Sequence, residues 1–190
     1  MLLFVFYTFE FKNMIRRYRY LPLASKVLLT MVDKKQSPRQ ASAVPYRRNE
    51  AGNLEFCLIT SANRGDWIFP KGIVDPGETP PETALKEAHE EAGIAGHIEG
   101  KALGKYNYRK WGSKLQVTAY LMCVEDESES WDEDDFRQRC WQTPEEAWTI
   151  IERDHVRELL KLAVARLDGE DFDRLVDCEK QVCKAGGKNK

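Results

Sequence analysis

A loop rich in glycine and proline runs directly into a helix that is marked at both ends, and this feature most constrains the fold. Thr79, two prolines and Glu82 predict a helix N-terminus with a capping box. Residues 84–92 continue with helical character, and Gly93 is placed to end the helix. The preceding loop, residues 72–78, contains two glycines and a proline, so its backbone can closely approach a ligand.

Three carboxylates lie close together on this helix, at Glu87, Glu90 and Glu91. On a helical wheel they fall within an arc of roughly 100°, opposite the apolar side that holds Leu85 and Ala88. Carboxylates so close repel one another, and oxygen ligands crowded on one helix suit a hard divalent cation, Mg²⁺ or Mn²⁺. Because a run of this kind is by itself more often a solvated acidic face, the loop before it decides the interpretation.

The elements around this helix predict an α/β fold, a mixed β-sheet sandwiched between helices. Strands are expected over residues 41–46, 54–60, 98–103 and 115–124, and further helices over residues 143–151 and 154–167. The last helix carries an apolar stripe at helical spacing, which predicts that it packs against the sheet.

The two ends of the chain are expected to lie outside the folded domain. Residues 1–35 form an N-terminal extension, disordered or upstream of a true start near Met31, because the apolar stretch is too short to span a bilayer and no cleavage site follows it. A membrane-surface anchor is the alternative. We expect the domain over residues 36–168, and a C-terminal helix with a disordered basic tail over residues 169–190.

Composition sets few limits on partners. The net charge of −2, with 42% hydrophobic and 32% charged residues, is ordinary for a globular protein. The total charge therefore favours no class of partner, and only charge concentrated in part of the chain can indicate one. The five cysteines show no CxxC pair and no zinc-ligand spacing, which favours a reducing compartment. We therefore expect a cytoplasmic protein without a membrane partner; no feature fixes its oligomeric state.

The loop and helix together resemble the signature of the Nudix hydrolase family. That signature is a glycine, five residues, a glutamate, seven residues, arginine–glutamate, then a glutamate pair and a final glycine with an aliphatic residue. It matches over 23 residues, at Gly72, Glu78, Lys86, Glu87, Glu90, Glu91, Gly93 and Ile94. The resemblance makes Glu78, Lys86 and Gly93 structural residues of the loop. Lys86 stands where the family usually has arginine. Lysine keeps the positive charge but lacks the bidentate fork of arginine, so we expect a looser loop without loss of activity.

The resemblance implies a magnesium- or manganese-dependent hydrolase that cleaves a diphosphate bond with a metal-activated water. Glu87, Glu90 and Glu91 are then the catalytic residues and hold one or more metal ions, with the Gly72 carbonyl as a further ligand. The general base is either Glu90 or a carboxylate of the loop. His89 is expected to be an exposed bystander.

A second, less specific resemblance concerns the substrate. Residues 67–72 (WIFPKG), with residues 139–141 and 144–147, resemble the subgroup that acts on diphosphoinositol polyphosphates and dinucleoside polyphosphates. No proline lies between Pro81 and Pro144, so the downstream proline of ADP-ribose-type members is missing, as is the SQPWPFP-like segment of NADH-cleaving members.

A basic stretch without acidic residues, residues 100–124, predicts where a polyphosphate binds. It contains five lysines and arginines interleaved with aromatic residues, and arginine is a bidentate clamp for phosphate. The candidate substrate-binding residues are Arg39, Arg64, Lys71, Arg109 and Lys114. The alternative is an ordinary solvated hairpin. Residues 125–135 carry eight acidic residues and are interpreted as a solvated loop, with a second metal site as the alternative.

We therefore expect a hydrolase whose partner is a small phosphorylated metabolite, with a dinucleoside polyphosphate or a diphosphoinositol polyphosphate as the preferred substrate. An RNA 5′-end pyrophosphohydrolase, binding RNA through the same hairpin, is the first alternative. A catalytically silent Nudix-fold binding module is the second, and the presence of all three glutamates argues against it.

Overall fold

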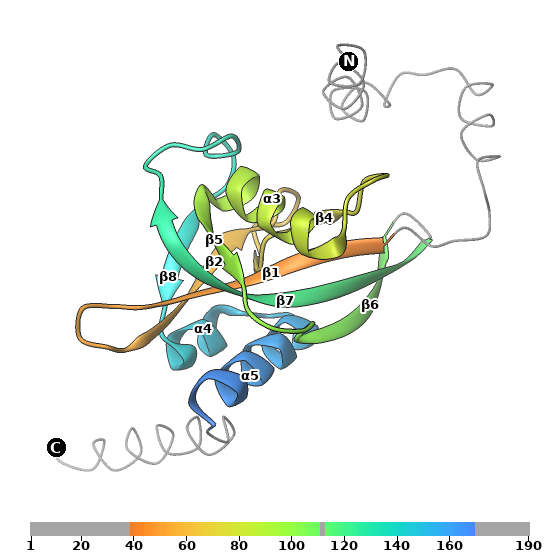
Figure 1. Cartoon of the computed structure of the whole chain (residues 1–190). Coiled ribbons are helices and arrows are strands. Elements are labelled where there is room, and N and C mark those ends of the chain that lie inside the picture. Colours follow the sequence, from red (N-terminus) through yellow and green to blue (C-terminus); the bar gives the residue numbers. More distant parts are fainter. Residues whose placement is uncertain (1–38, 111–112, 170–190) are drawn as a thin grey trace, which may run out of the picture. The chain divides into compact units, whose positions relative to one another are not determined.

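The computed structural model describes residues 39–110 and 113–169, shown in colour in Figure 1. The chain divides into two units, Met1–Ser37 and Pro38–Lys190, and only the second contains described residues. The predicted N-terminal extension and all of the predicted tail except Gly169 lie outside the described residues. Their assignment therefore stays a prediction.

A mixed sheet, with eight strands among the described residues, forms the centre of the domain. The elements are β1 (Arg39–Arg48), β2 (Leu54–Thr60), β3 (Trp67–Ile68), β4 (Lys71–Ile73), α3 (Pro80–Ala92), β5 (Ile94–Ile98), β6 (Gly104–Lys110), β7 (Ser113–Glu127), β8 (Arg139–Gln142), α4 (Pro144–Ile150) and α5 (Asp154–Asp168). The central strands β1 and β7 run parallel, whereas β7 pairs antiparallel with β5 and β6. Helix α3 covers one face of the sheet, and α4 and α5 lie on the other (Figure 1). The predicted α/β fold is confirmed.

One predicted strand, residues 98–103, is wrong. This segment connects β5, which ends at Ile98, to β6, which begins at Gly104. Gly100 has a φ of 64°, a left-handed conformation that breaks extended structure and favours glycine. The strands on either side of this segment, β5 and β6, were not predicted from the sequence, and neither were the short strands β3, β4 and β8. In β6, Tyr106 and Tyr108 alternate with polar residues.

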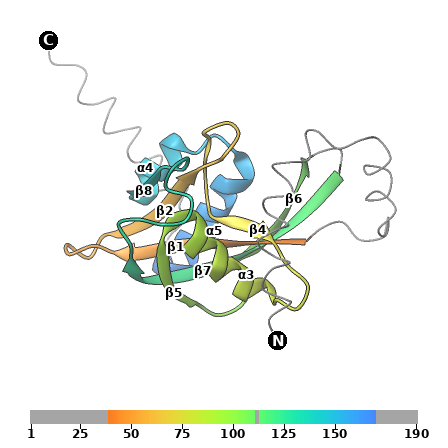
Figure 2. The ribbon, with the colours of Figure 1, turned by 90° about the horizontal axis from the view of Figure 1, so that it is seen from above.

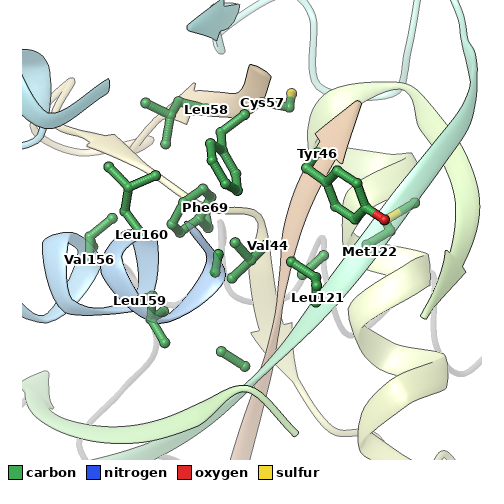
Figure 3. Close-up of a cluster of buried hydrophobic side chains, with 14 of the residues drawn as sticks. Val44, Tyr46, Cys57, Leu58, Phe69, Leu121, Met122, Val156, Leu159 and Leu160 are labelled. Carbon is green, nitrogen blue, oxygen red and sulfur yellow. The ribbon is translucent and has the colours of Figure 1, made fainter. Parts of the chain in front are cut away.

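The apolar stripe of α5 packs against the sheet as predicted (Figure 3). Val156, Leu159 and Leu160 are buried and face a cluster that includes Val44 and Leu121 from the two central strands. Complete burial of a leucine side chain contributes roughly 2 kcal/mol, so this stripe anchors the helix firmly. No helix in the described ranges is long and apolar enough to cross a membrane.

Helix α3 is held close to the opposite face of the sheet by small side chains. Ala84, Ala88 and Ala92 are completely buried, which lets the helix backbone approach β1 and β5. Figure 2 shows the helix lying across the sheet with β4 beside it. The predicted capping is confirmed: the Glu82 carboxylate accepts a hydrogen bond from the Thr79 amide at 2.8 Å.

Candidate active site

The three glutamates of α3 differ in their surroundings. Glu87 and Glu91 are only 7% and 5% exposed, whereas Glu90 is partly exposed. Placing all three on a face opposite the buried side was therefore wrong for two of them. Glu87 and Glu91 continue a buried line that begins at Thr83, because Gly72 and Lys71 of β4 lie against them. His89 is exposed, as expected.

Gly72 and Glu87 are brought into direct contact. A Cβ atom on Gly72 would lie 1.9 Å from Glu87 Oε1 and 2.1 Å from its Cδ, far inside van der Waals distance. Gly72 is in β4, opposite Ala41 of β1, so the sheet fixes its backbone. Glycine is required here because the carboxylate occupies the space that any side chain would need.

Both carboxylate oxygens of Glu91 have partners. Oε2 accepts a hydrogen bond from the Lys71 backbone N–H at 2.8 Å, and Oε1 accepts one from the Arg137 guanidinium. Burial raises the pKa of Glu91 above its ordinary value, and the positive charges of Arg137 and Lys71 oppose that shift. Lys71, predicted to bind substrate, thus contributes its backbone to the site. Arg137 was not predicted from the sequence. Its position after the acidic run was the one sequence feature that distinguished it.

Lys86 ties the loop between β4 and α3 to the helix. Its Nζ lies 2.7 Å from Glu78 Oε1 and 2.9 Å from Asp75 Oδ2. The Thr83 hydroxyl donates to the other oxygen of Glu78 at 2.8 Å. Although burial opposes the shift, hydrogen bonds from Lys86 and Thr83 lower the pKa of Glu78. The lysine therefore replaces the arginine fork with contacts to two carboxylates, one of which, Asp75, the sequence did not indicate.

The segment between β7 and β8 packs on the C-terminal end of α3. Arg139 Nη1 donates to the Ala92 carbonyl at 2.6 Å, and the Ser128 amide donates to the Gly93 carbonyl at 2.8 Å. Trp131 also lies so close to Gly93 that a Cβ there would be 2.8 Å from it. The predicted loop over residues 125–135 is wrong at its start, because residues 125–127 continue β7. Most of the acidic residues beyond them are exposed, as expected for a solvated loop, but the segment also fixes the end of the helix.

The basic hairpin formed by β6 and β7 brings two predicted substrate residues together. Arg109 and Lys114 are directly opposite one another in the strand register and are both exposed. An open hollow of about 290 Å³ is lined by Asn107, Tyr108, Arg109 and Lys114. Arg39 is exposed on β1, in register with Gln116. Because side chains alternate along strands, these three cations share the sheet face that α3 covers.

The remaining predicted residues of the substrate site lie elsewhere. Arg64 is exposed in the loop between β2 and β3. Tyr106 points to the other face of the sheet, where its ring stacks on His155 of α5 at 4.4 Å. The Tyr108 hydroxyl donates to Gln40 Oε1 at 2.7 Å. Alternation along β6 therefore places the tyrosines and Arg109 on opposite faces of the sheet, although Tyr108 also lines the hollow beside Arg109 and Lys114.

The residue types fit a hard divalent cation. Carboxylates and a backbone carbonyl supply only oxygen ligands, and the Gly72 backbone lies against Glu87 beside a second buried carboxylate. Within residues 39–110 and 113–169, no group of three or more His, Cys, Asp or Glu side chains is arranged to hold an ion. The metal ligands Gly72, Glu87, Glu90 and Glu91 therefore stay a prediction that rests on residue type and position.

Comparison with known proteins identifies the family. The family model of the NUDIX domain matches residues 37–162, about two thirds of the chain. This chain belongs to the Nudix family. The Nudix signature thus runs from Gly72 in β4 through the loop and α3 to Ile94, the first residue of β5, and β4, the loop and α3 assemble the candidate site.

Its Nudix relatives agree with the predicted subgroup. The chain is 33% identical over 128 residues to Nudix hydrolase 21, chloroplastic, of Arabidopsis thaliana, with 65% of this chain and 64% of that protein covered. It is 28% identical over 123 residues to diphosphoinositol polyphosphate phosphohydrolase NUDT4B of Homo sapiens, with 63% and 66% covered. The crystal structure of C. elegans Ap4A hydrolase superimposes with a TM-score of 0.60 at 28% identity, over 70% of this chain and 99% of that one.

The chain spans 64% and 61% of the lengths of Nudix hydrolases 21 and 4 of Arabidopsis, just under two thirds. Several relatives are named as chloroplastic or mitochondrial. The cytoplasmic location therefore stays an expectation from the sequence.

Proposed function

We propose that this Nudix protein is a Mg²⁺- or Mn²⁺-dependent hydrolase that cleaves a phosphoanhydride bond in a small polyphosphorylated metabolite. The observation that supports this most is the contact between the Gly72 backbone and the Glu87 carboxylate, beside the buried Glu91. Buried charges are costly and apolar side chains would pack better at both positions, so packing alone does not account for two buried glutamates.

The proposed chemistry assigns a role to each group. Glu87, Glu90 and Glu91, with the Gly72 carbonyl, would hold the metal, which would supply positive charge to the diphosphate and would acidify the attacking water. A carboxylate must then accept the proton of that water. The two candidates are Glu90, which is partly exposed, and a carboxylate of the loop, where Glu78 is held by Lys86 and Thr83.

For the substrate we propose a dinucleoside polyphosphate or a diphosphoinositol polyphosphate. The names of the two relatives, an Ap4A hydrolase and a diphosphoinositol polyphosphate phosphohydrolase, support this class. So does the placement of Arg39, Arg109 and Lys114 on the face that carries the catalytic helix. Each phosphate contact from these side chains is a charge-assisted bond, so chains with more phosphates gain affinity.

A substrate panel tests the proposal. The full chain, with Mg²⁺, would be assayed against Ap4A, a diphosphoinositol polyphosphate, ADP-ribose, NADH and RNA with a 5′-triphosphate. We expect the highest kcat/KM for one of the first two, and no turnover in EDTA. A kcat/KM that is highest for ADP-ribose, or independent of phosphate number, would contradict the substrate class. Preferred, salt-sensitive hydrolysis of the RNA would support the RNA alternative.

A further inference from the structure

Arg137 connects three elements at the edge of the proposed site. Its Nη2 forms an ion pair with Glu91 of α3, and its Nε pairs with Glu133 of its own segment. Its Nη1 donates to the Thr60 carbonyl, at the end of β2, at 2.8 Å. The Arg137 and Glu91 side chains are only 9% and 7% exposed, so this pair is screened little by water.

The guanidinium fixes one oxygen of a carboxylate whose other oxygen is fixed by the sheet. The Lys71 amide, which donates to Glu91 Oε2, belongs to β4, and the next residue of that strand is Gly72. With separate donors on Oε1 and Oε2, the Glu91 carboxylate has one defined orientation relative to the Gly72 backbone. Removing the Arg137 donor takes away the hydrogen bond that orients Oε1.

The backbone next to Arg137 is hydrogen-bonded to neighbouring elements. The Thr60 amide donates to the Gln138 carbonyl at 3.0 Å, and the Gln138 amide donates to the Thr60 hydroxyl at 2.9 Å. Two residues from Arg137, Arg139 pairs with Glu127 at 2.7 Å and donates to the Ala92 carbonyl. The backbone around Arg137 is thus fixed both to β2 and to the end of α3.

We propose that Arg137 is a positioning residue, which orients the Glu91 carboxylate for the metal through the geometry of its guanidinium as well as through its charge. This inference rests on the proposed function, because it takes Glu91 to be a metal ligand. The planar fork places separate N–H groups on Glu91, Glu133 and Thr60, whereas the single ammonium of lysine cannot reach all three. Arg137→Lys therefore keeps the positive charge and removes the simultaneous contacts of the guanidinium with Glu91, Glu133 and Thr60.

The experiment compares the wild type, Arg137→Lys and a matched control, Arg153→Lys. Arg153 also pairs through two nitrogens with a carboxylate, that of Asp66 in the loop between β2 and β3. The readouts are the dissociation constant for Mn²⁺, measured by electron paramagnetic resonance without substrate, then kcat and KM separately, and the melting temperature.

We expect Arg137→Lys to weaken Mn²⁺ binding and to lower kcat by about tenfold, as is typical when a group that orients a metal ligand is lost. KM should change much less. Arg153→Lys should lower the melting temperature by a similar amount and leave the Mn²⁺ affinity unchanged.

Wild-type Mn²⁺ affinity and kcat in a destabilised Arg137→Lys protein would overturn the inference, because Arg137 would then be purely structural. A wild type that neither binds Mn²⁺ nor hydrolyses the panel would instead refute the proposed function. Should Arg137→Lys not fold, Glu133→Gln provides the test, because it removes the carboxylate that holds Nε and so loosens the orientation of the guanidinium that donates to Glu91. A reduced Mn²⁺ affinity would support the inference, and an unchanged one would overturn it.

Discussion

Replacing Gly72 by alanine tests the contact at the centre of the proposed site. The new Cβ would lie 1.9 Å from Glu87 Oε1, and an ordinary van der Waals contact between such atoms is at least 3.4 Å. The carboxylate must therefore move by about 1.5 Å or more. Because the obstructed atoms are the end of a flexible side chain, the stability cost should be modest, roughly 1–3 kcal/mol. The effect on catalysis should be large, since a misplacement of about 1 Å costs on the order of a hundredfold.

The assay is kcat/KM for the best substrate of the panel, together with thermal unfolding. Gly52→Ala is the control: Gly52 lies in the turn between β1 and β2 with a φ of 81° and has no atom within 4 Å of its Cβ position. The control should lose stability through backbone strain and keep its kcat/KM. If Gly72→Ala also retains wild-type kcat/KM, then Glu87 does not need this position, and the reasoning that places it at the reaction is refuted.

Three further predictions follow from the site. Glu90→Gln should leave the melting temperature nearly unchanged but lower turnover by about a hundredfold or more, because a neutral amide binds Mg²⁺ poorly; comparable rates would exclude it as ligand and base. Arg109→Ala and Lys114→Ala should lower kcat/KM more for long polyphosphates than for ADP-ribose, and equal losses for both would show that the hairpin does not recognise phosphate number. Because the pKa of Glu78 is lowered in the folded state, its ion pair with Lys86 stabilises above the ordinary glutamate pKa and is lost as the pH falls through the lowered value. The difference in melting temperature between the wild type and Lys86→Ala should thus shrink in acid, and a difference that is constant with pH would contradict this role.

The sequence determined the elements whose signals are local. The capping box at Thr79, the end at Gly93 and the stripe of α5 all depend on residues within a few positions of one another, because helical contacts join residues three and four apart. The spacing of the Nudix signature likewise indicated the family, since its residues lie within 23 consecutive positions of the chain.

The tertiary structure alone decided how those residues are surrounded. Arg137 reaches Glu91 across 46 residues, because the β7–β8 segment is fixed to both β2 and α3. The burial of Glu87 follows from the pairing of β4 with β1, and the separation of Tyr106 from Arg109 follows from alternation along β6. A helical wheel or a run of charges contains no information on which strand closes over which face. That depends on sheet pairings between distant segments, whose free energy comes from burial of the whole core and not from any one local pattern.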